Sequence, residues 1–215
     1  MTENHSRTAL LVIDAQASFP HRPYWQVDNV GEYLVEQNRL IQGCLANDIP
    51  VIRIFHVEPS GVFSLASGFV KPLEGLVAFE ASFTLQKHAH SAFSGTPLAS
   101  WLIRRGINRL IISGIRTEQC CETTTRCASD LGFAVDYVTA ATLTFPMKHS
   151  SGRTFATDEI KVRTELVLEG RFAHIVSVDE ALERAASNVA SDVTPSAAMN
   201  KTTNPAATTD VAAVA

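Results

Sequence analysis

Two adjacent cysteines, Cys120 and Cys121, lie in the stretch GIRTEQCCETTTRC at residues 114–127, directly after a short apolar run. A thiol with an ordinary pKa of ~8.5 needs help to become a nucleophile at neutral pH. Unpaired N–H groups at the start of a helix give part of that help and can also hold an oxyanion beside the sulfur. With Thr117 as the helix cap, Cys120 falls in such a first turn. A metal site, a redox pair or two buried thiols are the alternatives.

Two charged residues could complete a cysteine nucleophile. Asp14 follows the apolar stretch TALLVI and could accept the thiol proton. Lys87 follows SFTLQ and could keep Asp14 ionised while adding positive potential near the sulfur. On their own, however, an aspartate in this position often only caps a turn, and most lysines are solvated.

The other cysteines, Cys44 and Cys127, do not point to a metal or a disulfide. No CxxC spacing occurs in the chain, so a structural zinc site has no support. Neighbouring residues such as Cys120 and Cys121 rarely form a disulfide, because the bond strains the peptide between them. We expect Cys44, Cys121 and Cys127 to pack in the core.

Alternating strands and helices would bring these residues together. Strand-like stretches lie at residues 8–14, 49–57, 82–88, 107–113, 133–139 and 173–178. Helix-like stretches lie at residues 28–48, 96–106, 117–132, 157–170 and 179–187. This alternation predicts an α/β fold with a parallel sheet covered by helices on both faces. Ligands bind beyond the carboxyl ends of such strands, where Asp14, His56, Lys87 and the turn before Cys120 are expected.

Composition narrows the class of protein. The chain has 215 residues, a net charge of −4 and no basic cluster, so nucleic acid and anionic membranes are not expected partners. The apolar run at residues 9–13 is too short for a signal peptide or a membrane span, which favours a cytoplasmic protein. We expect one domain over residues 1–187, a long loop at 58–81, and a flexible low-complexity tail over 188–215.

Three stretches in order resemble the isochorismatase-like cysteine hydrolase superfamily: LLVIDAQASF, LQKHAHSAFSGTPLASWLIRRGINRLIISGIRTEQCCETT and CASDLGFAVDYVTAAT. The resemblance covers residues 8 to about 182. It implies a Rossmann-like three-layer α/β/α fold with a six-stranded parallel sheet. It also implies Asp14 as catalytic acid and base, Lys87 as catalytic lysine and Cys120 as nucleophile. The family carries a non-proline cis bond at the position of Ile115–Arg116, which turns the N–H groups of Arg116 and Cys120 toward the substrate oxygen.

The chain departs from the family pattern at several positions. Cys121 replaces a usual valine, and Ala140 replaces the aspartate of a DA pair. The segment FHVEPSG keeps one histidine, His56, but lacks the spaced metal motif of the nicotinamidase branch. We therefore expect no metal and no cofactor. His88 and His90 are interpreted as polar loop residues.

Substrate contacts are expected from Phe19, Trp25, His56 and Arg116, with Phe63 and Phe69 as further candidates for a pocket wall. Arg116 could face a substrate carboxylate or point to solvent. The family resemblance implies an amidohydrolase that cleaves a C–N bond of a small amide, ureido or N-carbamoyl compound through a thioester, with Asp14 moving each proton. The alternatives are vinyl ether hydrolysis and a non-catalytic thiol sensor. The partners expected are a small-molecule substrate and further copies of the chain, in a dimer or tetramer.

Overall fold

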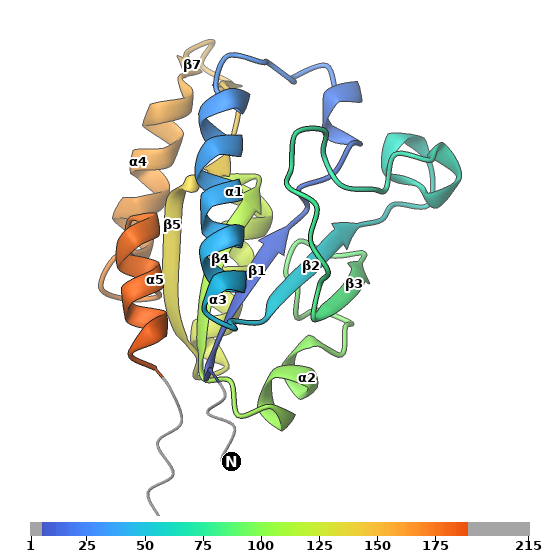
Figure 1. The fold of residues 1–215 in the computed structure, drawn as a ribbon. Coiled ribbons are helices and arrows are strands. Elements are labelled where there is room, and N and C mark those ends of the chain that lie inside the picture. The colour runs from blue at the N-terminus through green and yellow to red at the C-terminus, as the bar shows by residue number, and fades with distance from the viewer. Residues whose placement is uncertain (1–5, 189–215) are drawn as a thin grey trace, which may run out of the picture.

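The computed structural model describes residues 6–188, which form one sheet with helices on both of its faces (Figure 1). All pairings in the six-stranded sheet are parallel, in the order β3-β2-β1-β4-β5-β8. The strands are β1 (Thr8–Ile13), β2 (Val51–His56), β3 (Phe83–Lys87), β4 (Arg109–Ile115), β5 (Ala134–Leu143) and β8 (His174–Ile175). The predicted six-stranded α/β fold is confirmed.

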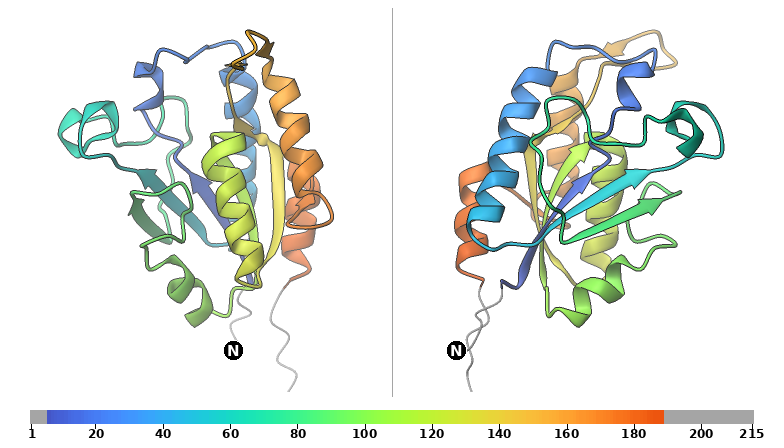
Figure 2. Two further views of the ribbon diagram at one scale, coloured as in Figure 1. Left: turned by 180° about the vertical axis from the view of Figure 1, so that it is seen from behind. Right: turned by 45° about the vertical axis from the view of Figure 1, so that its right-hand side comes forward.

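Helices lie on both faces of the sheet (Figure 2). Each face is buried in its own apolar cluster. The helices are α1 (Val30–Ala46), α2 (Leu98–Arg104), α3 (Glu122–Asp130), α4 (Thr157–Leu168) and α5 (Val178–Ala186). Helices α1 and α5 cover one face, and α2 and α3 cover the other. Strand β1 shows why both faces need cover: Leu11 and Ile13 enter one cluster, while Leu10 and Val12 enter the other.

Several local expectations need correction. The segment predicted as a helix from residue 117 begins as a π-helical turn at Thr117–Cys121 before α3. Thr117 does not cap it, because its hydroxyl shares a 2.8 Å hydrogen bond with the Thr142 hydroxyl on β5. An unpredicted antiparallel pair, β6 (Met147–Lys148) and β7 (Thr154–Phe155), precedes α4. Cys127 is only half-buried, whereas Cys44 and Cys121 are buried as expected.

Strands β1 and β4 approach each other closely where they reach the carboxyl edge of the sheet. Gly114 has φ +123°, and a Cβ on it would lie 1.9 Å from the carbonyl oxygen of Ile13. Only glycine fits there. The next residue after Ile13 is Asp14, which itself has a positive φ of 51°. The glycine of LIISGI therefore allows the backbone packing that positions Asp14.

The two ends of the described chain meet at the opposite edge of the sheet. The Arg7 N–H donates to the Asn188 carbonyl at 3.0 Å, and the Asn188 amide donates to the Thr8 hydroxyl at 3.0 Å. Asn188 is thus part of the folded unit, and the remainder of the predicted tail, residues 189–215, lies outside the described residues. Within residues 6–188, no helix is long and apolar enough to span a membrane.

Candidate active site

Three strand ends bring Asp14, Lys87 and Cys120 into contact. The Nζ atom of Lys87 lies 2.7 Å from Oδ2 of Asp14 and donates to Sγ of Cys120 at 3.3 Å. It also donates to the carbonyl of Ala89 at 3.1 Å. Asp14 follows β1, Lys87 ends β3, and Cys120 lies in the π-helical turn that follows β4. The side chains of Lys87 and Asp14 are 0% and 1% exposed.

Burial and charge set the protonation of this cluster. Burial raises the pKa of Asp14, although the Lys87 ammonium opposes this shift. Burial, and after it the Asp14 charge, raise the pKa of the Cys120 thiol to about 12, although Lys87 partly opposes them. Burial alone would lower the pKa of Lys87, but the charges of Asp14 and Cys120 raise it above its ordinary value. At neutral pH the thiol is therefore protonated, and an attack by sulfur requires a base.

His56 lies against the same lysine. Its Nδ1 atom is 3.3 Å from Nζ of Lys87, and its Nε2 atom is 3.7 Å from a carboxylate oxygen of Glu58. Burial, followed by the positive charge of Lys87, lowers the pKa of His56. A neutral His56 can therefore accept a hydrogen bond from Lys87 at Nδ1.

Gln16 fixes the backbone of His56 and was missed in the sequence analysis. Its side-chain oxygen accepts from the His56 N–H at 2.8 Å, and its side-chain nitrogen donates to the His56 carbonyl at 3.1 Å. The same nitrogen donates to the Ser18 hydroxyl at 2.9 Å. Gln16 is fully buried, so these bonds are not exchanged for bonds to water. Its place two residues after Asp14 is the only signal in the sequence.

The peptide bond between Ile115 and Arg116 is cis. Of the two orientations considered from sequence, exposure to solvent is wrong, because the Arg116 side chain is only 8% exposed and forms an ion pair of 2.9 Å with Glu118. Its guanidinium carbon lies 4.7 Å from the ring centroid of Tyr24. The Arg116 carbonyl accepts from the N–H groups of Gln119 and Cys121.

A cavity of about 190 Å³ opens onto Cys120. It is lined by residues from six segments of the chain: Asp14, Phe19, Arg22, Tyr24, His56, Glu58, Phe63, His90, Arg116, Gln119 and Cys120. Phe19, His56 and Arg116 are thus at the cavity wall, whereas Trp25 is outside it and packs 5.2 Å from the Phe145 ring. Tyr24 lines the cavity instead, and the Trp25 N–H donates to the Arg22 carbonyl at 3.0 Å.

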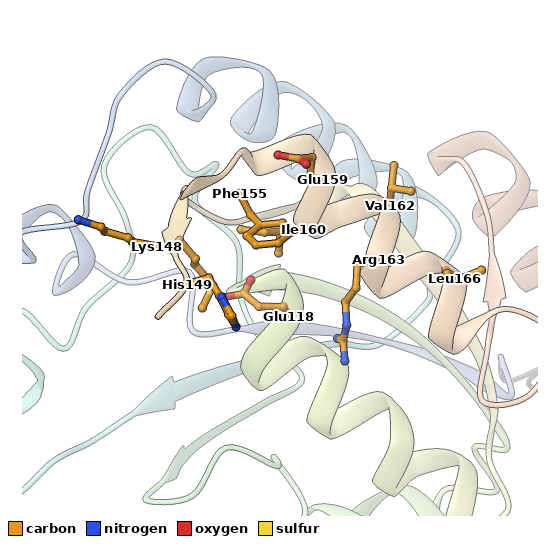
Figure 3. Close-up of a pocket in the computed structure, with 10 residues that line it drawn as sticks. Glu118, Lys148, His149, Phe155, Glu159, Ile160, Val162, Arg163 and Leu166 are labelled. Atoms are coloured by element: carbon orange, nitrogen blue, oxygen red, sulfur yellow. The ribbon is translucent and has the colours of Figure 1, made fainter. Parts of the chain in front are cut away.

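A larger cavity, of about 630 Å³, lies between the β6–β7 hairpin and α4 (Figure 3). Its walls are mostly apolar and hold neither Asp14, Lys87 nor Cys120. Glu118 projects toward it from the turn before α3 (Figure 3). The ion pair of Glu118 with Arg116 joins the walls of the two cavities. Size alone would select this cavity, but Asp14 and Cys120 both line the smaller one. Within residues 6–188, no three His, Cys, Asp or Glu residues are grouped to hold a metal ion.

His90 is a neighbour of the Cys120 sulfur that the sequence did not indicate. Its Nδ1 atom lies 3.8 Å from Sγ of Cys120, and its exposed side chain lines the cavity. The rings of His90 and His56 are parallel, with centroids 6.3 Å apart. The run KHAHSAF gave no indication of which of its histidines would face the cysteine.

The sequence of this chain is similar to those of known proteins. The model of the isochorismatase domain matches residues 8–179. An uncharacterised isochorismatase family protein, YrdC of Bacillus subtilis, is 25% identical over 178 residues, covering 81% of this chain and 94% of that protein. Nicotinamidase 3 of Arabidopsis thaliana is 34% identical over 96 residues, covering 45% of this chain and 43% of that protein.

Solved structures have the same fold. A crystal structure from Burkholderia xenovorans LB400, of a protein provisionally named an isochorismatase, matches with a TM-score of 0.77 and 28% identity, covering 86% of this chain and 89% of that one. A cysteine hydrolase from Pseudomonas syringae pv. phaseolicola 1448A matches with a TM-score of 0.76 and 19% identity, covering 87% of this chain and 100% of that one. The second likeness concerns the fold alone.

Proposed function

The chain belongs to the isochorismatase family of hydrolases, and from this membership we propose that it is a cysteine-dependent amidohydrolase. Its substrate would be a small amide, ureido or N-carbamoyl compound, cleaved at a C–N bond through a thioester. One observation carries the proposal: the Lys87 ammonium contacts both the Asp14 carboxylate and the Cys120 sulfur inside a closed cluster. The name of a nicotinamidase among similar proteins agrees with cleavage of a C–N bond.

Asp14 supplies the base that a protonated thiol needs. As Sγ of Cys120 attacks the substrate carbonyl, the thiol proton moves to the Asp14 carboxylate, whose raised pKa makes it a stronger base than an ordinary aspartate. Lys87 stays positive and stabilises the charge that develops on sulfur. The N–H groups of Arg116 and Cys120 are the proposed donors to the oxyanion. Asp14 then returns its proton to the departing nitrogen, and water hydrolyses the thioester.

The cavity limits the size of the substrate. Its volume of about 190 Å³ is below the roughly 300–1,000 Å³ of pockets for drug-sized ligands. Phe19, Tyr24 and Phe63 supply an apolar wall, and Arg116 supplies a cation next to Cys120. A small acyl group fits this space, and a peptide or polymer does not.

The two adjacent cysteines provide a matched test. We expect release of ammonia from a panel of small amides and ureido acids by the wild type and by Cys121→Ala, and none by Cys120→Ala. Loss of activity in the Cys121 variant with retention in the Cys120 variant would overturn the assignment. Vinyl ether hydrolysis needs no thiol, so turnover that survives complete alkylation of Cys120 would favour that alternative.

A thiol sensor is disfavoured by the same environment. Redox-sensing cysteines are exposed and have a lowered pKa. Cys120 is buried, and its pKa is raised to about 12. A sensor would also be oxidised by dilute peroxide without hydrolysing any amide, which mass spectrometry of the peptide containing Cys120 would show.

A further inference from the structure

We infer that His90 is the general base that activates water for hydrolysis of the thioester on Cys120, in place of Asp14. The inference rests on the proposed thioester chemistry and adds a second base to it. Its starting point is the 3.8 Å contact between Nδ1 of His90 and Sγ of Cys120. In a thioester the carbonyl carbon is one bond from that sulfur, so a water that attacks this carbon passes within reach of the His90 ring.

The loop that carries His90 is tied on both sides to the reactive cluster. The preceding residue, Ala89, offers its carbonyl to the Lys87 ammonium at 3.1 Å. On the other side, the Ala92 N–H donates to the Thr124 hydroxyl on α3 at 3.0 Å. Ala92 also accepts a hydrogen bond from the Thr96 hydroxyl. The position of His90 beside Cys120 is therefore built into the fold, since one anchor is the catalytic lysine and the other is the helix after the nucleophile.

Asp14 is poorly placed to receive a proton from incoming water. Its side chain is only 1% exposed, and one of its oxygens lies 2.7 Å from Lys87. Its side chain interacts with the Cys120 thiol, and once it has passed the thiol proton to the leaving nitrogen its charge again balances Lys87. His90, in contrast, has a side chain that is exposed to solvent and lines the cavity.

The other titratable groups around His90 are already engaged. His56, whose ring is parallel to that of His90, contacts Lys87 through Nδ1 and approaches Glu58 through Nε2. Lys87 is held by Asp14 and the Ala89 carbonyl. Of the ring nitrogens in the described part of the chain, only that of His90 has a hydrogen-bond contact with Sγ of Cys120.

The two half-reactions balance with one base each. In the first, the C–S bond forms, the C–N bond breaks, and the thiol proton travels through Asp14 to the leaving nitrogen. In the second, a water O–H bond breaks, its proton goes to the His90 ring, and the water oxygen bonds to the thioester carbon. The C–S bond then breaks, sulfur takes the electron pair, and His90 returns the proton to sulfur. The products are a carboxylic acid and the free thiol.

Burst kinetics with p-nitrophenyl acetate separate the two half-reactions, because its leaving group needs no proton. Acylation releases a burst of p-nitrophenolate, and the later steady rate reports deacylation. We expect His90→Gln to keep the burst while the steady rate falls by roughly 100-fold or more. The acetylated peptide containing Cys120 should then accumulate and be detected by mass spectrometry. His88→Gln, in the same loop but directed at the Val57 carbonyl, is the matched control and should resemble the wild type.

Two further readouts exclude a purely structural effect. The steady rate of the wild type should fall at acid pH as the base takes up a proton, and this acid limb should be absent in His90→Gln. Free imidazole should partly restore the steady rate of His90→Ala. An unchanged steady rate in His90→Gln, with a normal burst, overturns the role of His90 alone. A burst that persists in Cys120→Ala, or that is missing in both the wild type and His90→Gln, overturns the proposed nucleophile instead.

Discussion

Lys87 and Asp14 form an ion pair, 2.7 Å from Nζ to Oδ2, in which both side chains are withdrawn from solvent. Removing one member of a buried pair leaves the other charge without a partner, which costs about 3–5 kcal/mol. We expect Lys87→Met to lower the free energy of unfolding by an amount of this order, measured by urea denaturation. The double variant with Asp14→Asn should lose clearly less than the sum of the two single variants. Simple additivity would contradict the pairing.

The raised pKa of Asp14 predicts the pH dependence of acylation. Only the carboxylate can accept the thiol proton, so the burst rate with p-nitrophenyl acetate should fall as the pH falls through the pKa of Asp14. Burial raises this pKa above its ordinary value of 3.8, so the rate should be lost at a higher pH than an exposed aspartate would give. Stopped-flow measurement of the burst across acid pH tests this. A midpoint at or below the ordinary value would contradict it.

Gly114 should not tolerate a side chain. A Cβ there would lie 1.9 Å from the Ile13 carbonyl oxygen, so the carboxyl ends of β1 and β4 would have to separate. We expect Gly114→Ala to yield little folded protein, as judged by circular dichroism and thermal unfolding. Gly95→Ala is the control, because Gly95 also has a positive φ, of 69°, but has open space around its Cβ position. It should cost only about 1 kcal/mol, the strain of a left-handed residue. Equal losses of stability in the two variants would show that backbone strain, and not the close approach of β1 and β4, makes Gly114 necessary.

Gln16 should stabilise the end of β2 through its bonds to His56. Gln16→Leu removes both partners of the His56 peptide groups, and each buried group left unpaired costs about 1–3 kcal/mol. We expect a lower midpoint of urea unfolding for this variant. Gln26→Leu, at an exposed position, should leave the midpoint nearly unchanged. Equal unfolding midpoints for the two variants would show that the bonds from Gln16 to His56 do not contribute measurably to stability.

The sequence was sufficient to predict the frame of the site. Strands with apolar residues on both faces, such as β1, identify a covered parallel sheet. Parallel strands end at a common edge, so Asp14 and Lys87 could be assigned to one side of the molecule before any coordinates were known. The order of the motifs then indicated Cys120 rather than Cys121, two residues that composition cannot distinguish. Their different positions in the π-helical turn leave Cys120 beside Lys87 and Cys121 fully buried.

What the sequence missed depends on local turns and on partners far along the chain. Tyr24 lines the cavity and its neighbour Trp25 does not, a difference that follows from the path of the turn that holds them. Threonine is a common helix cap, but the Thr117 hydroxyl forms a hydrogen bond with the hydroxyl of Thr142, which is distant in sequence. His90 differs from His88 only in the path of a short loop, which Lys87 and Thr124 fix from outside.

The meeting of Arg7 and Asn188 has a practical consequence for handling the protein. Arg7 directly precedes β1 and meets Asn188 where the strands begin, whereas the cavity is lined by residues at the carboxyl ends of the strands. A matrix or fusion module tethered at residue 188 would leave the mouth of the cavity facing outward. The same proximity would let a short linker join residues 7 and 188. A circular permutant could then open the chain at the exposed hairpin tip of residues 149–153 and keep the edge of the sheet that carries the cavity.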